Sequence, residues 1–123
     1  MAMHDPKKVF KVERHGDVLV VLPQGPALDF RYQEVHLESN ALYRVVDEPQ
    51  LKHVVVDLGA VNFVDSVIIS SILRVLTRVK QRGGKAVFCC GSENMQSVLK
   101  CIKIGKLWPH FDTREEAIEF VHG

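Results

Sequence analysis

The stretch that decides the fold is KHVVVDLGAVNFVDSVIISSILRVLTRVKQRGG, residues 52–84. It opens with an uninterrupted apolar run, Val54–Val56, which is typical of a strand buried on both faces. A short loop leads to Asp65-Ser66, and from there apolar residues recur at helical spacing until the glycines at 83–84 end the pattern. The segment therefore predicts a strand, a loop and a long helix. It places a carboxylate and a hydroxyl at the carboxyl end of a sheet, where open α/β folds usually carry their sites.

A helical wheel predicts which side of this helix faces solvent. One broad arc is apolar and is assigned to the core: Ile68, Ile69, Ile72, Leu73, Val75, Leu76 and Val79. The opposite arc is polar: Ser66, Ser70, Ser71, Arg74, Thr77, Arg78 and Gln81. Val67 is apolar but falls in the polar arc next to Ser66. We interpret it as part of a docking face.

The flanking segments predict the other elements. Strands are expected at Val9–Val12 and Val18–Leu22, joined by the turn Arg14–Asp17, at Lys85–Cys90, and weakly at Leu107–Phe111. Helices are expected from Phe30 to about Asp47 with Asp29 as N-cap, from Ser92 to Gly105, and after the capping-box residue Thr113. The first of these helices carries two apolar stripes, both expected to be buried: Phe30, Leu37, Ala41 and Val45, and Val35, Leu42 and Val46.

This order predicts an α/β fold. The sheet is mixed, with a parallel centre and an antiparallel N-terminal hairpin strand, and about four helices pack on it. We expect residues 1–7 to be poorly ordered and residues 8–122 to form a single domain. Loops leaving the carboxyl ends of the strands should bring four polar residues to one edge: Asp29, Asp65, Ser66 and Ser92.

Composition narrows the function classes. The chain has 123 residues and a formal net charge of +1, and no basic run interleaves with aromatic residues, so nucleic-acid binding is disfavoured. Neither a signal peptide nor an apolar run long enough to span a membrane is present, which predicts a cytoplasmic protein. The three cysteines, Cys89, Cys90 and Cys101, are consistent with a reducing compartment. Because Cys89 and Cys90 are adjacent on a strand, they are expected to point to opposite faces.

Catalytic and ligand-binding patterns are weak. The six histidines show no metal-ligand spacing with one another or with the cysteines, and the glycines at 83–84 end a helix and do not begin one, so no metal or cofactor site is predicted. Asp57 and Asp65 could form a carboxylate pair, but a strand end and a helix cap explain them more simply. Ser66 lacks the G-x-S-x-G elbow of a nucleophile. A small α/β enzyme remains as an outside hypothesis, which a histidine or metal beside Ser66 would favour.

Taken together, these residues carry a resemblance to a known family. The strand at 54–59, Asp65-Ser66, the helix ending at 83–84, the strand at 85–90 and the tail from Leu107 resemble the STAS domain of bacterial anti-sigma-factor antagonists. The likeness extends back through Leu28-Asp29 and covers roughly residues 9–121. The resemblance implies a non-catalytic module whose serine after the aspartate, here Ser66, is phosphorylated by a partner anti-sigma factor that is also a kinase. A phosphatase resets the switch.

The resemblance also implies a binding surface for that partner, for which we select six residues: Asp29, Asp65, Ser66, Val67, Ser70 and Arg74. The oligomeric state stays open, with a weak homodimer as one alternative. Glycine commonly stands at two positions of the family pattern that Ile68 and Ser70 occupy here. Bulk at Ile68 favours the alternative function, that of an unphosphorylated STAS scaffold or accessory subunit in a signalling or transport complex.

Overall fold

The computed structural model describes residues 8–104 and 107–123, which contain a mixed five-stranded sheet in the order β1-β2-β3-β4-β5. The strands are β1 Phe10–His15, β2 Val18–Pro23, β3 His53–Asp57, β4 Ala86–Cys89 and β5 His110–Phe111. β1 pairs with β2 antiparallel, and every later pair is parallel. The predicted α/β class, with its parallel centre and antiparallel hairpin, is confirmed.

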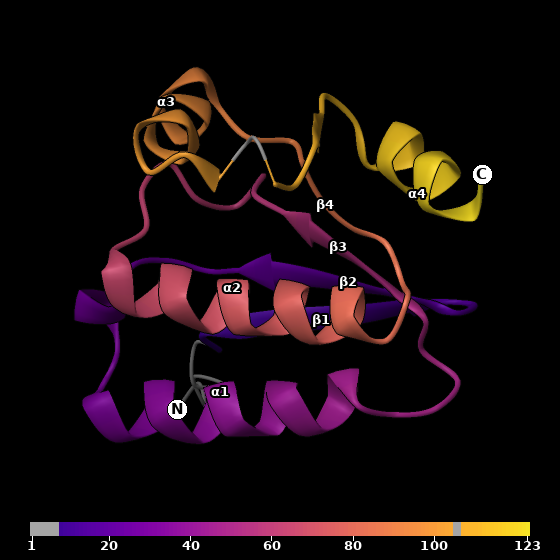
Figure 1. The fold of residues 1–123 in the computed structure, drawn as a ribbon. Coiled ribbons are helices and arrows are strands. Elements are labelled where there is room, and N and C mark those ends of the chain that lie inside the picture. Colours follow the sequence, from indigo (N-terminus) through magenta and orange to yellow (C-terminus); the bar gives the residue numbers. More distant parts are fainter. Residues whose placement is uncertain (1–7, 105–106) are drawn as a thin grey trace, which may run out of the picture.

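Helices cover both faces of this sheet. They are α1 Tyr32–Val46, α2 Ser66–Gln81, α3 Glu93–Cys101 and α4 Arg114–His122, with a short 3-10 turn, η1, at Ala27–Asp29. Figure 1 shows α1 and α2 lying side by side, with α4 set apart from them near the carboxyl terminus. None of the helices in the described part of the chain is long and apolar enough to span a membrane.

The central strand explains the uninterrupted apolar run of the sequence. Val54 and Val56 belong to the larger apolar cluster under α1 and α2, whereas Val55 belongs to the smaller cluster under α4. All three side chains are fully buried. Because both faces of β3 meet a helix layer at Val54–Val56, none of these three positions can be polar at low cost, and the predicted two-sided burial is confirmed.

The end of α2 follows the predicted glycine signal. Gly83 adopts a φ of +87°, its N–H donates to the Lys80 carbonyl at 3.0 Å, and the Gly84 N–H donates to the Val79 carbonyl at 2.9 Å. This pair of bonds is a Schellman cap, which satisfies carbonyls that the helix would leave open. Gly84 also lies very close to the backbone before β3. An added Cβ at this position would be 1.8 Å from the carbonyl oxygen of Lys52, so a larger residue does not fit.

The start of α1 differs from the prediction. The helix begins at Tyr32 with Arg31 as N-cap, and Asp29 lies outside it, in η1. The Asp29 N–H donates to the Pro26 carbonyl at 3.0 Å, which closes the 3-10 turn, and Phe30 then adopts an extended conformation that separates the turn from the helix. The proline starts a turn of its own, so Asp29 does not cap the helix.

The two apolar stripes of α1 are not equally buried. Val35, Leu42 and Val46 are buried against the sheet, whereas Leu37 is exposed. The prediction that Leu37 packs in the core was wrong. A helix lying on a sheet buries one face only, and the sheet side is the face that Val35, Leu42 and Val46 share.

Ser71 also lies on the opposite side from its predicted place. It is buried, and its hydroxyl forms a 2.9 Å hydrogen bond with the hydroxyl of Ser39 on α1. Small side chains at this position let α1 and α2 approach each other, and the mutual hydrogen bond satisfies both buried hydroxyls.

The remaining boundaries shift by a few residues. The turn between β1 and β2 contains only Gly16 and Asp17, shorter than the four residues expected. α3 ends at Cys101, and its predicted end at Gly105 lies outside the described residues, as do residues 1–7. The N-caps expected at Ser92 and Thr113 are both present.

Candidate functional site

The site is built around the residue that begins α2. Asp65 is its N-cap, and the Oδ1 atom of Asp65 accepts the Ile68 N–H at 3.2 Å, as a capping carboxylate should. The Oδ2 atom of the same side chain accepts the N–H of Ala27 at 2.8 Å. One carboxylate therefore fixes the start of α2 and also attaches η1 to it.

Ser66 is exposed in the first turn of α2, next to this cap. Within residues 8–104 and 107–123 no hydrogen bond to the Ser66 hydroxyl occurs, so the group is available to solvent or to a partner. Val67 is also exposed, as its place on the wheel predicted. Ile68, in contrast, is fully buried in the larger core cluster. Its bulk points into the domain and does not obstruct the surface at Ser66, which removes the argument that Ile68 blocks docking.

Large exposed apolar side chains occur near the start of α2, where Leu28, Tyr32 and Val67 line a hollow with Asp65, and Phe63 lies in the preceding loop. Leu28 and Tyr32 are 89% and 82% exposed, and Phe63 and Val67 are about half exposed. We call these four residues together with Ser66 the Ser66 face. Between η1, α1 and α2 lies a hollow of about 320 Å³ lined by Ala27, Leu28, Phe30, Tyr32, Val35, Asp65 and Val67. Single exposed apolar residues are ordinary, but a cluster of large ones around a hollow is typical of an interaction surface.

The sequence indicated Val67 as part of this face but did not indicate Leu28, Tyr32 or Phe63. The three residues come from separate segments: η1, the first turn of α1 and the loop before α2. Their positions in the sequence gave one indication: all three are large apolar residues in or beside the loops at the edge of the sheet where the site was predicted. A helical wheel of α2 contains none of these three residues.

The other predicted partner-binding residues extend the site in two directions. Asp29 is exposed in η1, two residues after the Ala27 N–H that Asp65 binds. Ser70 and Arg74 are exposed one and two turns along α2 from Ser66, and the Arg74 guanidinium lies 5.0 Å from the ring centre of Tyr43 on α1. The structure thus brings Asp29 beside the helix start, while Arg74 lies farther along the α1–α2 surface.

Ser92 binds the loop that precedes α2. Its hydroxyl donates to the Oδ1 atom of Asn62 at 2.8 Å, and the side-chain amide of Asn94 donates to the Asn62 carbonyl at 2.7 Å. The beginning of α3 therefore supports the loop before α2. Asn62, which the sequence did not single out, connects the two.

The carboxylate pair considered from the sequence has two separate structural roles. Asp57 ends β3, where its Oδ1 accepts the Gly59 N–H at 2.8 Å and its Oδ2 accepts a hydrogen bond from Arg114 on α4 at 2.9 Å. Asp65 caps α2. No histidine in the described part of the chain hydrogen-bonds Ser66. This geometry offers Ser66 as a group that another protein can contact or modify.

Replacing Asp65 with alanine should lower the free energy of unfolding by about 1–2 kcal/mol, because both the Ile68 and Ala27 N–H groups lose their acceptor. Asp65→Asn keeps one acceptor oxygen and should lose less than half as much. Urea unfolding of the two variants beside the native chain measures the difference. An Asp65→Ala variant as stable as the native chain would show that the double hydrogen bond contributes nothing.

The family model of the STAS domain matches residues 9–117. No curated protein sequence matches the chain significantly. An anti-sigma-factor antagonist (STAS) domain protein from Planctomyces limnophilus is 26% identical, with a TM-score of 0.77, over 93% of this chain and 98% of that chain.

More distant structures share the fold alone. The phosphorylated form of the Bacillus cell fate determinant SpoIIAA is 18% identical, with a TM-score of 0.68, over 91% of this chain and 98% of that chain. A murine solute carrier 26 family member A9 anion transporter is 11% identical, with a TM-score of 0.66, over 89% of this chain and 18% of that chain.

Proposed function

The chain belongs to the STAS domain family, and on that premise we propose that it is an anti-sigma-factor antagonist. In this proposal it is a non-catalytic cytoplasmic module that binds an anti-sigma factor with serine kinase activity. The partner phosphorylates Ser66, the phosphorylated form no longer binds, and a phosphatase restores the binding form. The protein acts through this partner and makes no direct contact with nucleic acid.

The observation that carries the proposal is the exposed Ser66 hydroxyl at the start of α2, next to exposed apolar side chains and a hollow. Leu28, Tyr32, Phe63 and Val67 supply apolar area for a partner, while Ser66 supplies the one aliphatic hydroxyl in the Ser66 face. A kinase must reach the hydroxyl it modifies, and a binding protein must bury apolar area to gain affinity. Both requirements meet at the same place.

The physics of a phosphate at Ser66 favours a switch in binding and not in folding. A phosphoserine adds a charge of about −2, and a helix amino terminus stabilises an anion through its unsatisfied N–H groups. The fold should therefore tolerate the modification. A partner that covers the Ser66 face would have to desolvate that charge beside the Asp65 carboxylate and four apolar side chains, which opposes docking.

The remaining selected residues take supporting roles in this proposal. Asp65 holds the helix start and η1 in place, and Asp29 offers a carboxylate at the rim of the surface. Ser70 and Arg74 continue the contact along α2. Charges at the rim of an interface mainly set orientation and association rate, so Asp29 and Arg74 are proposed to guide the partner more than to hold it.

A second function is compatible with the same fold and the same exposed surface. The STAS fold also occurs in a murine anion transporter, where it is part of a much longer chain. An unphosphorylated scaffold or accessory subunit would use the same apolar surface constitutively. The two functions differ in one respect, which is whether Ser66 ever carries phosphate.

Mass spectrometry of the protein isolated from its own cells tests this difference. We expect a single phosphate on Ser66, lost in Ser66→Ala and kept in Ser70→Ala, because Ser70 lies on the same exposed helix face and is the matched control. With the purified cognate anti-sigma factor, Ser66→Asp should weaken binding at least about tenfold, or about 1.4 kcal/mol. Thr77→Asp, at an exposed position of α2 outside the six selected residues, should change it less than about twofold, a few tenths of a kcal/mol. If Ser66 carries no phosphate and Ser66→Asp binds the anti-sigma factor with native affinity, the phosphorylation switch is rejected and the unphosphorylated scaffold is favoured.

A further inference from the structure

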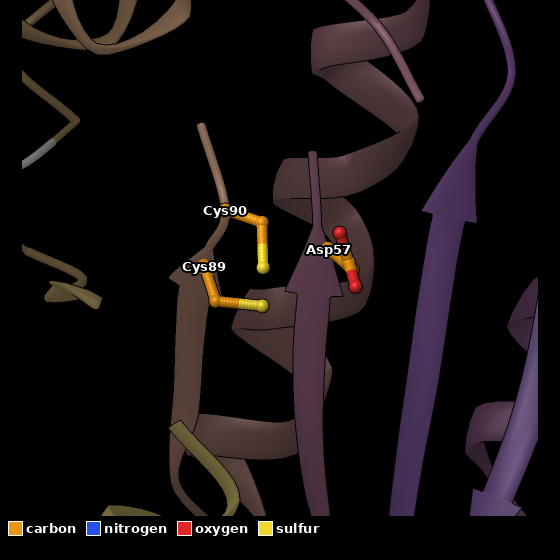
Figure 2. Close-up of side chains that lie close together, drawn as sticks. All are labelled: Asp57, Cys89 and Cys90. Carbon is orange, nitrogen blue, oxygen red and sulfur yellow. The ribbon is translucent and has the colours of Figure 1, made fainter. Parts of the chain in front are cut away.

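A second group of reactive side chains lies at the same edge of the sheet, on the α4 side. Asp57 ends β3, and Cys89 and Cys90 stand at the end of β4, with the two sulfur atoms and a carboxylate oxygen all within 4.8 Å of one another. Figure 2 shows the two sulfur atoms lying close together, on the side of β4 that faces β3. Among the described residues this is the one group of three side chains with metal-ligating atoms this close together.

The convergence of the two thiols overturns a sequence expectation. Adjacent residues on a strand point to opposite faces, but β4 ends at Cys89, and Cys90 adopts the left-handed conformation with a φ of +61°. This conformation turns the Cys90 side chain back toward Cys89. For a residue other than glycine it costs about 1–2 kcal/mol, and such strained positions concentrate at functional sites and ligand clamps. The Cys90 N–H is held by the Phe111 carbonyl at 3.0 Å.

Asp57 is already oriented in the way that carboxylate ligands usually are. The Gly59 N–H binds one of its oxygens and the Arg114 guanidinium binds the other. An ionised carboxylate has about four lone-pair positions, so each oxygen can keep its hydrogen bond and still bind an ion. Contacts of this kind fix the direction of a metal ligand and tune its affinity.

The charges of the cluster point to a divalent ion. The Asp57 carboxylate is already balanced by Arg114. A divalent ion that displaces both thiol protons brings in as much positive charge as the two new thiolates bring negative charge. Such an ion would leave the net charge of the buried site unchanged.

We propose that Asp57, Cys89 and Cys90 bind one thiophilic divalent cation of the Zn²⁺ and Cd²⁺ class. Two sulfur ligands select these ions over Mg²⁺ and Ca²⁺, which prefer oxygen alone. Tetrahedral zinc with bonds of about 2.3 Å to sulfur needs ligand atoms about 4 Å apart, and the present atoms lie within 4.8 Å of one another. Cys90 is partly exposed and Gly59 is exposed, so the ion can enter from that side, where water can supply a fourth ligand.

Titration of the reduced, metal-free chain with CdCl₂ tests the proposal, since thiolate-to-cadmium charge transfer absorbs in the ultraviolet and counts bound thiolates. We expect saturation at one ion per chain with two thiolates, a lower apparent cadmium affinity in the presence of excess ZnCl₂, and a higher melting temperature with either ion. Cys90→Ser should weaken cadmium binding at least tenfold. Cys101→Ser is the matched control, because that thiol is exposed and distant in sequence, and it should bind as the native chain does.

Melting of each variant without metal checks that it is folded. Equal titration curves for the native chain and folded Cys90→Ser would overturn the proposal, as would loss of the signal in Cys101→Ser. Hydrogen peroxide treatment provides a further test. Two thiols and one peroxide give a disulfide and two waters, with a mass loss of two hydrogens. A Cys89–Cys90 disulfide in a chain that binds no cadmium when reduced would assign the pair to redox chemistry and reject the metal site.

Discussion

Replacing Arg114 with alanine is expected to lower the free energy of unfolding by about 3 kcal/mol, because it leaves a buried carboxylate without its cation. The Nε atom of Arg114 donates to Asp57 at 2.9 Å, and its terminal NH1 donates to Glu13 on β1 at 3.0 Å. The Asp57 side chain is only 8% exposed and that of Arg114 is 25% exposed. One side chain on α4 thus connects the carboxyl end of β3 with the edge strand of the sheet.

Urea unfolding of Arg114→Ala and Arg14→Ala measures this effect against a matched control. Arg14 also pairs with a carboxylate, that of Glu48, but this pair lies in solvent, so its loss should cost far less stability than the loss of Arg114. A double variant, Asp57→Ala with Arg114→Ala, should recover part of the loss, since the unpaired carboxylate is then absent. If Arg114→Ala and Arg14→Ala lose the same stability, burial adds nothing to the Asp57–Arg114 pair.

The second large effect is expected at Gly84. A methyl group there would lie 1.8 Å from the carbonyl oxygen of Lys52 and 2.8 Å from a Val79 methyl. The Lys52 carbonyl cannot easily yield, because the N–H of the same residue donates to the Asp17 carbonyl at 2.8 Å. Backbone must therefore move, and Gly84→Ala should lose about 3 kcal/mol of stability.

Gly83 is the control for this substitution. It is the neighbouring residue of the same cap, with a φ of +87°, and an added methyl group would meet nothing within 4 Å. Gly83→Ala should therefore cost only the strain of the left-handed conformation, about 1 kcal/mol. Thermal or urea unfolding of the two variants ranks them. Equal losses would show that conformation dominates at both positions and that the close approach to Lys52 relaxes freely.

Much of the fold could be predicted because its signals are local. The run Val54–Val56, the caps at Ser92 and Thr113 and the glycines at 83–84 each occupy a few neighbouring residues, and each forms as expected. Leu37 and Ser71 could not be placed this way. Which stripe of α1 faces the sheet, and which serine meets α1, depends on how the two helices pack, and the sequence of one helix does not contain that information.

The candidate site divides in the same manner. Asp65, Ser66 and Val67 are consecutive; the N-cap pattern predicted the role of Asp65, and the helical wheel placed Ser66 and Val67 on the exposed side, as the structure has them. Leu28 and Tyr32 come from earlier segments and join the face only after the chain has folded. Cys90 is a third case, since strand alternation sent its thiol to the wrong face, and only the left-handed backbone at the end of β4 reverses it.

The hydrogen bond from the Ala27 N–H to Asp65 spans 38 positions of the chain. What a partner meets at the start of α2 is therefore a discontinuous epitope, assembled from stretches that no short peptide contains together. A search for linear sequence motifs would not detect such an epitope. A synthetic peptide around Ser66 would lack part of it and should bind a partner less well than the intact protein.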